Sequence, residues 1–162
     1  MKSKEIKTNA MRILDRAKIP YQLCSYECTE FVDGITVADR LGQDYEATFK
    51  TLVTRGKSGG YYVFVIPVHR ELDLKKASRI VGEKSLEMLP VKEIQQVTGY
   101  IRGGCTPIGM KKKYPTVIQD SARQQEQIAV SGGRRGTQII LTSQDLAEVT
   151  DGIFGDVIKS CI

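Results

Sequence analysis

The sequence predicts one α+β domain built around a mixed β-sheet. The expected elements are short and of both types, and their order is too irregular for a repeating strand–helix–strand unit. With 41% hydrophobic and 27% charged residues among 162, the composition is that of a globular protein. A chain of this length can bury about two-thirds of its unfolded surface. No linker or internal repeat divides the sequence, so residues 1–162 are expected to form a single domain.

The first part of the chain predicts two helices and three strands. Apolar residues at helical spacing follow Thr8, a capping residue, and end before Pro20. A second helical pattern runs from Ile35 to Leu41 and stops at Gly42. Strands are expected at Tyr21–Tyr26, Thr48–Thr54 and Tyr61–Val68, and a turn-rich segment at 55–60 joins the last two.

The remainder of the chain continues this mixture. Glycines follow two helical patterns, Leu74–Val81 and Val91–Val97, and Pro90 can open the second. A capping box, Thr142 to Asp145, predicts the start of a last helix. Strands are expected at Leu86–Leu89, Thr116–Gln119, Gln127–Ser131 and Gln138–Leu141, with an irregular, glycine-rich segment at Tyr100–Gly109.

Residue counts exclude several chemistries. The one histidine, His69, cannot supply a multi-histidine metal site, and the cysteines (Cys24, Cys28, Cys105 and Cys161) form no C-x-x-C pair. We therefore expect no metal, no cofactor, and cysteines that remain reduced and mostly buried. No segment approaches the roughly 20 apolar residues of a membrane span, and the charged N-terminal residues lack the apolar core of a signal peptide. The expected location is the cytoplasm, without membrane association.

Two glycine-containing segments do not qualify as nucleotide-binding loops. Gly56-Lys57-Ser58 has Thr51 where a phosphate-binding loop requires another glycine, and it lies between two expected strands. A hairpin turn is therefore the favoured interpretation. The segment at 131–136 does not match the G-x-G-x-x-G pattern of dinucleotide-binding folds.

Lys50 stands out as a cation within an apolar strand. Strand alternation places it on the same face as Thr48 and Leu52. A partly desolvated lysine there would suit a substrate that carries a carboxyl, phosphate or ribose group. The alternative is an edge-strand lysine that points into water.

Glycine-rich turns and basic clusters form the next candidate site. In Gly103-Gly104-Cys105-Thr106-Pro107 the glycines allow close backbone approach to a ligand, and exposed N–H groups can hold a developing oxyanion. Ser131-Gly132-Gly133 offers a second such turn. The clusters Lys111-Lys112-Lys113 and Arg134-Arg135, with a net charge of +5, would permit contact with a phosphate backbone. Ordinary turns and solvated charged faces are the alternatives.

Three segments together resemble a known family. Residues 49–52 (FKTL), 98–112 (TGYIRGGCTPIGMKK) and 130–136 (VSGGRRG) resemble the YbaK/EbsC family of Cys-tRNA(Pro) deacylases. These are similar to the editing domain inserted in bacterial prolyl-tRNA synthetases. The resemblance spans nearly the whole chain, and it implies a partly barrel-like mixed sheet surrounded by short helices.

The resemblance also implies roles for individual residues. Lys50 matches the functional lysine of the family, and Gly103, Gly104 and Cys105 match the start of its G-x-x-x-P loop. Thr106 stands where many members carry serine, and Arg134 stands where many carry lysine. The expected substrate-binding residues are Tyr26, Thr51, Thr106, Pro107, Ser131 and Gly132. The basic clusters predict tRNA contacts at Lys111, Lys112, Lys113, Arg134 and Arg135.

The expected function is removal of cysteine from mischarged tRNA(Pro) by a free-standing enzyme. No Ser-His-Asp or metal constellation is present, which fits the route implied by the resemblance, in which the substrate thiol cleaves its own ester and leaves as a thiolactone. That product is why family members are also described as lyase-like. The expected partners are the acceptor end of aminoacyl-tRNA and prolyl-tRNA synthetase. The alternatives are a deacylase for another mischarged amino acid, such as Ala-tRNA(Pro), and a noncatalytic tRNA-binding module.

Overall fold

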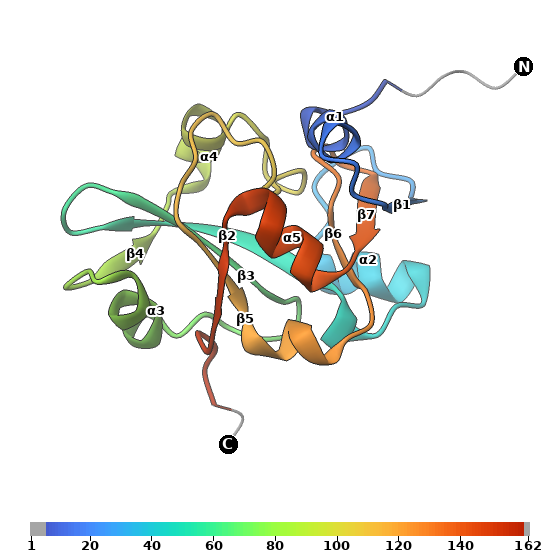
Figure 1. The fold of residues 1–162 in the computed structure, drawn as a ribbon. Helices are drawn as coiled ribbons and strands as arrows, with labels where there is room; N and C mark the ends of the chain where they lie inside the picture. The colour runs from blue at the N-terminus through green and yellow to red at the C-terminus, as the bar shows by residue number, and fades with distance from the viewer. Residues whose placement is uncertain (1–5, 161–162) are drawn as a thin grey trace, which may run out of the picture.

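A computed structural model describes residues 6–160 and confirms the α+β class (Figure 1). The five α-helices are α1 (Asn9–Arg16), α2 (Gly34–Leu41), α3 (Leu74–Val81), α4 (Val91–Thr98) and α5 (Ser143–Thr150). The strands are β1 (Gln22–Ser25), β2 (Phe49–Gly56), β3 (Tyr61–Pro67), β4 (Leu86–Met88), β5 (Thr116–Gln119), β6 (Ile128–Ser131), β7 (Thr137–Leu141) and β8 (Ile153–Gly155). Two short 3₁₀ helices, η1 (Tyr45–Ala47) and η2 (Asp120–Gln124), complete the elements.

The strands form two sheets. A five-stranded mixed sheet has the order β4-β2-β3-β5-β8, and a three-stranded antiparallel sheet has the order β1-β7-β6. An isolated parallel bridge between Thr48 and Ala129 joins the start of β2 to β6. This bridge connects the two sheets at one point, and the strands within residues 6–160 do not close a barrel.

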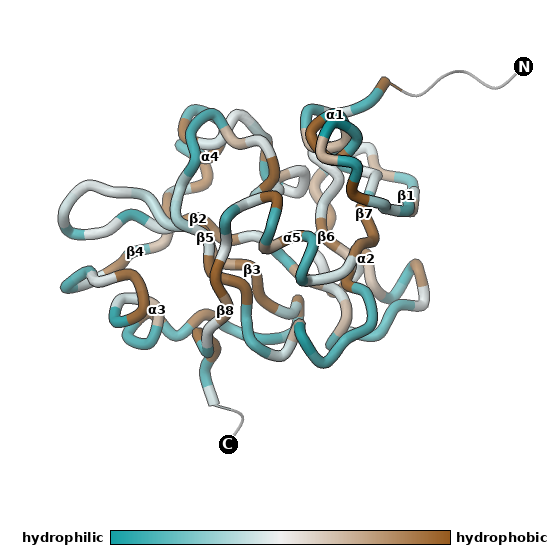
Figure 2. The backbone as a smooth tube through the Cα atoms, viewed as in Figure 1, coloured by the Kyte–Doolittle hydropathy of each residue, from teal (hydrophilic) through white to brown (hydrophobic). Residues whose placement is uncertain are grey.

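Strand β3 is the buried central strand of the larger sheet. Residues 63–66 are all 0% exposed, since β2 pairs with one edge of β3 and β5 with the other. Val65 packs with α1, α5 and the smaller sheet, whereas Phe64 and Ile66 pack on the opposite face with α3. A strand that is buried on both faces has a continuously apolar sequence, as β3 has at residues 63–66. Figure 2 shows these hydrophobic residues gathered along β3, β5 and β8 at the centre of the molecule.

Helix ends follow the predicted capping residues. The Thr8 and Thr142 side chains accept hydrogen bonds from the first turns of α1 and α5, and Gly99 ends α4 in the left-handed conformation. Pro90 lies one position earlier than predicted, as the N-cap of α4. Within residues 6–160, no helix has the length and hydropathy that crossing a membrane requires. The sequence did not predict β8, η1 or η2.

Candidate functional site

A cavity of about 620 Å³ lies beside the open edge of β2. Its walls come from α2 and the segment before it, the connection between β4 and α4, the loop after α4, and one end of the β6–β7 hairpin. This size is ordinary for a small-molecule site. Six of the residues predicted from the sequence line this single cavity: Tyr26, Lys50, Thr51, Gly103, Cys105 and Ser131.

The open edge arises because β4 is shorter than β2. It pairs with β2 only at Thr54, Arg55 and Gly56. The Thr48 carbonyl accepts from Val68 of the β3 side, whereas the Val53 carbonyl accepts from the Leu89 N–H beyond β4. Because hydrogen-bonding direction alternates along an antiparallel strand, the peptide N–H and C=O of Thr51 point away from β3, toward the open edge. The Thr51 hydroxyl is also buried without a hydrogen-bond partner, so the peptide N–H and C=O are the groups that this position directs toward the open edge.

Lys50, the strand lysine that the sequence singled out, lines the cavity. It is half-buried, and burial lowers the pKa of its ammonium group, an effect that the negative charge of Glu71 partly opposes. Glu71 itself forms an ion pair with Lys159 at 3.1 Å. Within residues 6–160, no carboxylate pairs with Lys50, so its charge is available to a ligand. The strand lysine therefore forms part of the cavity wall and is only partly exposed to solvent.

The glycine-rich loop contributes to the cavity through alternate residues. Gly103 (φ +87°) and Cys105 line it, whereas Gly104 does not. The Gly104 N–H donates to the Ile101 carbonyl at 2.9 Å, so this amide is not available as an oxyanion donor. An added Cβ at Gly104 would lie 2.9 Å from the Arg134 Cα atom. In this geometry Gly104 permits close packing of two loops, whereas Gly103 and Cys105 are the residues of this loop that line the cavity.

Three other predicted residues support the site from outside the cavity. Thr106 is fully buried, and its hydroxyl accepts from the Ile108 N–H at 3.5 Å. Gly132 closes the β6–β7 turn by donating its N–H to the Thr137 carbonyl at 2.8 Å. Pro107 lines a different, smaller cavity. Their positions correspond to shaping the two loops rather than to contact with a ligand in the large cavity.

The rim near the β6–β7 hairpin is polar. Ser131 is paired across this hairpin with Gln138, and both line the cavity. Gln138 is 5% exposed and exchanges amide hydrogen bonds with Gln43, at 2.6 and 3.1 Å. The Thr48 hydroxyl also donates to the Gln43 amide oxygen. This network fixes Gln138 in place, so a restrained side-chain amide lines the cavity.

The titratable groups nearby are engaged in ways that suit structure rather than nucleophilic catalysis. The Asp33 carboxylate accepts from the Thr36 N–H and hydroxyl at 2.9 Å each, and these bonds lower its pKa. His69 does not line the cavity and bonds Glu46 at 3.0 Å. Burial raises the pKa of the Cys105 thiol to about 12, which disfavours the reactive thiolate. Within residues 6–160, no three His, Cys, Asp or Glu side chains gather to hold a metal ion.

Comparison with known proteins identifies the family. Residues 33–149 match the family described as the aminoacyl-tRNA editing domain. The chain belongs to the aminoacyl-tRNA editing family. A relative in Enterococcus faecalis, named as the Cys-tRNA(Pro)/Cys-tRNA(Cys) deacylase EbsC, is 44% identical over 96% of both chains. The proline–tRNA ligase of Thermosipho melanesiensis is 31% identical over 46% of this chain, a match that covers 13% of the ligase.

Solved structures share the fold of this editing domain. A crystal structure described as a trans-editing enzyme for prolyl tRNA synthetase superposes with a TM-score of 0.81 at 21% identity, covering 96% of this chain and all of that one. The crystal structure of the hypothetical protein APE2540 gives a TM-score of 0.84 at 20% identity, covering 93% of this chain and 99% of the other. The family and the fold expected from the sequence motifs are confirmed.

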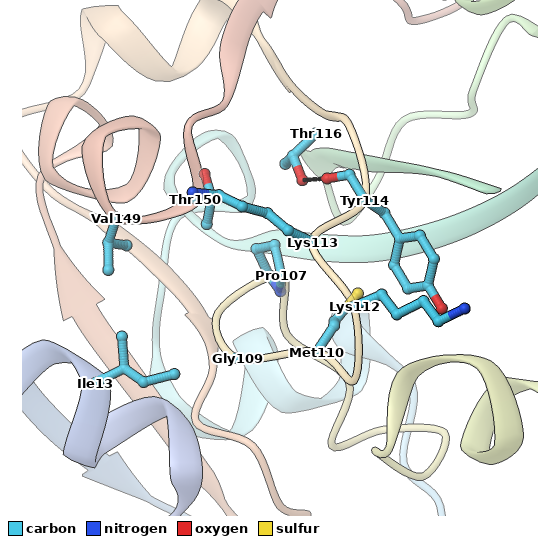
Figure 3. Close-up of a pocket in the computed structure, with 10 residues that line it drawn as sticks. All are labelled: Ile13, Pro107, Gly109, Met110, Lys112, Lys113, Tyr114, Thr116, Val149 and Thr150. Carbon is cyan, nitrogen blue, oxygen red and sulfur yellow. Dashed lines mark hydrogen bonds between the residues drawn. The ribbon is translucent and has the colours of Figure 1, made fainter. Parts of the chain in front are cut away.

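The basic clusters of this editing domain lie at separate places. Lys112 and Lys113 line the second cavity, of about 190 Å³, where Lys113 extends toward α5 and Lys112 extends alongside Tyr114 (Figure 3). Lys113 forms an ion pair with Asp151, and Lys111 is exposed and packs near Gly99. Their predicted contact with tRNA would therefore be made away from the large cavity.

The two arginines also differ from each other. The Arg134 guanidinium donates to the Ile6 carbonyl and to the Thr137 hydroxyl, so it braces the loop. Arg135 instead lies near the ring of Phe31, which lines the large cavity. Of the residues predicted to bind tRNA, Arg135 is thus placed beside the candidate editing site.

The polar and aromatic residues of the editing-domain cavity that sequence reasoning missed include Phe31, Arg102 and Gln138. Gln138 had the same signal as Lys50, a lone polar residue in an apolar strand. Arg102 directly precedes the glycine loop, within the 98–112 segment, and has no separate local signal. Phe31 lies in an irregular segment and had no local signal, because its importance comes from tertiary contacts.

Proposed function

We propose that this chain is a trans-editing enzyme that removes cysteine from mischarged tRNA(Pro), an activity that serves protein synthesis in the cytoplasm. The observation that carries the proposal is the composition of the large cavity, which combines a half-buried lysine, two loop residues with close backbone approach and polar walls, but no activated nucleophile. The name of the Enterococcus faecalis relative supports the same substrate class.

Substrate-assisted chemistry suits such a cavity. The sulfur of the substrate cysteine attacks its own ester carbonyl carbon, the bond to the terminal ribose oxygen breaks, and the thiol proton ends on that oxygen. The products are a tRNA with a free hydroxyl and a cyclic thiolactone. The protein then positions the substrate and stabilises the developing charge. These two effects together can account for much of the decrease in activation free energy.

Individual residues have distinct roles in this proposal. Lys50 anchors the substrate or its terminal adenosine electrostatically. The backbone amides of Gly103 and Cys105 surround the reacting carbonyl, and the open-edge peptide and hydroxyl of Thr51 bind the aminoacyl group. Tyr26 and Ser131 shape the pocket. A second site of this kind is needed because a synthetase pocket cannot strongly reject a near-isostere such as cysteine.

A comparison of charged tRNAs tests the proposal. Purified protein is incubated with Cys-, Ala- and Ser-tRNA(Pro), and with Cys-tRNA(Pro) whose thiol is methylated. We expect fast release of cysteine, slow release of alanine and serine, and protection by methylation. Equal hydrolysis of Ala-tRNA(Pro) would indicate a water-dependent deacylase with a different amino-acid preference. Binding of tRNA without any turnover would instead indicate a noncatalytic module.

A further inference from the structure

Two arginines share one aromatic ring at the large cavity. The Arg102 guanidinium carbon lies 3.9 Å from the centroid of the Phe31 ring, and that of Arg135 lies 5.9 Å from the same centroid. Cation–π contacts at these distances orient both guanidinium groups. Because Phe31 and Arg102 line the cavity, the cluster lies at its wall.

The backbone holds this cluster in a fixed geometry. Arg135 donates its Nε–H to the Arg102 carbonyl at 2.7 Å, which ties the β6–β7 turn to the loop after α4. Gly103 follows in the left-handed region, and an added Cβ there would lie 3.0 Å from the Phe31 ring and 3.3 Å from Arg135 Nε. The two cations are therefore positioned by packing rather than by carboxylate partners.

The positive charge of this cluster is not neutralised. Other surface cations have acidic partners, such as Arg55 with Glu87 and Lys76 with Asp156. Within the part of the chain that the structure describes, neither Arg102 nor Arg135 forms an ion pair with a carboxylate. Two neighbouring guanidinium groups without an acid favour binding of an anion, and their forked geometry matches phosphate oxygens.

We propose that Arg102, Phe31 and Arg135 form a phosphodiester-binding site for the single-stranded 3′ end of tRNA. The inference rests on the proposed function, because an aminoacyl ester that reacts beside Lys50 is followed directly by the last phosphodiesters of the acceptor end. Arg102 contacts one of these phosphates, Arg135 reinforces the local positive potential, and Phe31 orients Arg102. The cluster thereby positions the substrate and does not touch the reacting atoms.

A charge-deletion cycle on unacylated RNA tests this site without requiring turnover. The probe is a fluorescent acceptor-stem hairpin ending in CCA, made with natural linkages or with a neutral methylphosphonate at one of the last two linkages. Binding is measured by anisotropy over a range of salt concentrations for wild type, Arg102→Ala, Arg102→Lys and Phe31→Leu. Arg79→Ala is the matched control, since it removes one exposed positive charge from α3.

We expect one of the two methylphosphonate probes to bind wild type several-fold more weakly than the natural RNA does. The Arg102→Ala variant should bind that probe and the natural RNA with nearly equal affinity. Arg102→Ala should also reduce the slope of log K against log salt by about 0.7 to 0.9, the value for one phosphate contact. Arg102→Lys and Phe31→Leu should lose part of the affinity, and Arg79→Ala should behave like wild type. Thermal melts of all variants identify any that are unfolded.

Other outcomes would overturn the site. Independent, additive effects of Arg102→Ala and of both methylphosphonates would show that Arg102 contacts neither phosphate. Equal effects of Arg102→Ala and Arg79→Ala would show that Arg102 affects RNA binding only through the net charge of the protein. Because the probe carries no amino acid, phosphate coupling without deacylation would refute the proposed function alone, and deacylation without this coupling would refute the site alone.

Discussion

Gly104 packs directly against the backbone of Arg134, at a distance that leaves no room for a side chain. A Cβ at position 104 would lie 2.9 Å from Arg134 Cα and 3.1 Å from its carbonyl carbon. This contact joins the loop after α4 to the β6–β7 turn. The loop lines the large cavity, and so does Ser131, which directly precedes the turn. The relative position of Gly103 and Ser131 therefore depends on a glycine that does not itself line the cavity.

Replacing Gly104 by alanine should destabilise the protein and impair deacylation. Its neighbour is backbone and cannot move aside cheaply, so we expect a loss of about 1 to 3 kcal/mol, as for other overpacked sites. Gly60→Ala is the matched control, because a Cβ there meets only side-chain atoms, at 3.4 Å or more. Urea unfolding of both variants checks this expectation. Equal stabilities for the two would show that the loops are not held together at Gly104.

Local patterns explain which parts of the site the sequence could predict. A lysine in an apolar strand and a cluster of glycines are visible over a few residues, and the structure places Lys50, Gly103 and Cys105 at one cavity. The sequence did not show that Gly103 lines the cavity whereas Gly104 packs against Arg134. This difference depends on which amide already has a partner, and the Gly104 N–H is bonded to Ile101.

Features set by pairing between distant segments were not predictable. Strand β8 has only three residues, ends in glycine, and is extended because it pairs with β5. The contact between Phe31 and Arg102 likewise joins segments far apart in the sequence. Capping was better predicted, since Thr8 and Thr142 act on residues three positions away.

Lys50→Ala should abolish most deacylation while the fold remains intact. Removing one preorganised electrostatic contact typically lowers turnover about 10²- to 10³-fold. Because burial lowers the Lys50 pKa, the charged side chain opposes folding below that pKa. This cost declines as pH rises through the lowered pKa and is gone above the ordinary lysine value of 10.5. We therefore expect Lys50→Met to melt no lower than wild type at neutral pH. Lys57→Ala, in the exposed hairpin turn, is the control. A correctly folded Lys50→Ala with wild-type turnover would contradict the assignment.

Ligand affinity should fall on the alkaline side as Lys50 loses its proton. The pKa of Lys50 lies below 10.5, so the cation is present at lower pH and is lost as pH rises through this lowered value. A nonhydrolysable, amide-linked cysteinyl-adenosine is the probe, and isothermal titration across alkaline pH is the measurement. Lys50→Arg should shift the loss of binding to higher pH, since arginine stays protonated. Identical profiles for wild type and Lys50→Arg would assign the titration to another group.

None of the four cysteines should act as a nucleophile. The thiol at the cavity, Cys105, has a pKa raised to about 12 by burial, while Cys24 and Cys28 are partly exposed and do not line the cavity. Cys161 lies outside the described residues. We expect the fourfold alanine variant, if folded, to retain turnover within about tenfold of wild type. Loss of activity in a folded single variant would point instead to covalent catalysis.

The isolated chain should discriminate weakly between tRNAs. Its predicted tRNA contacts are lysines and arginines, and contacts to phosphates carry no base information directly. Arg135 lies beside the large cavity, whereas Lys112 and Lys113 lie at the second one. We therefore expect the chain alone to deacylate Cys-tRNA(Cys) as well as Cys-tRNA(Pro), with binding that weakens steeply as salt increases.

Selectivity for tRNA(Pro) should then come from a complex with prolyl-tRNA synthetase. Initial rates on Cys-tRNA(Pro) and Cys-tRNA(Cys) are compared with and without the synthetase, at equal concentrations of both tRNAs. Addition of the synthetase should raise the preference for tRNA(Pro), because the synthetase reads tRNA features that the 3′ end does not carry. A strong preference for tRNA(Pro) by the isolated chain would instead require a base-reading surface, and the exposed Lys111 to Lys113 segment would be the first place to test it by substitution.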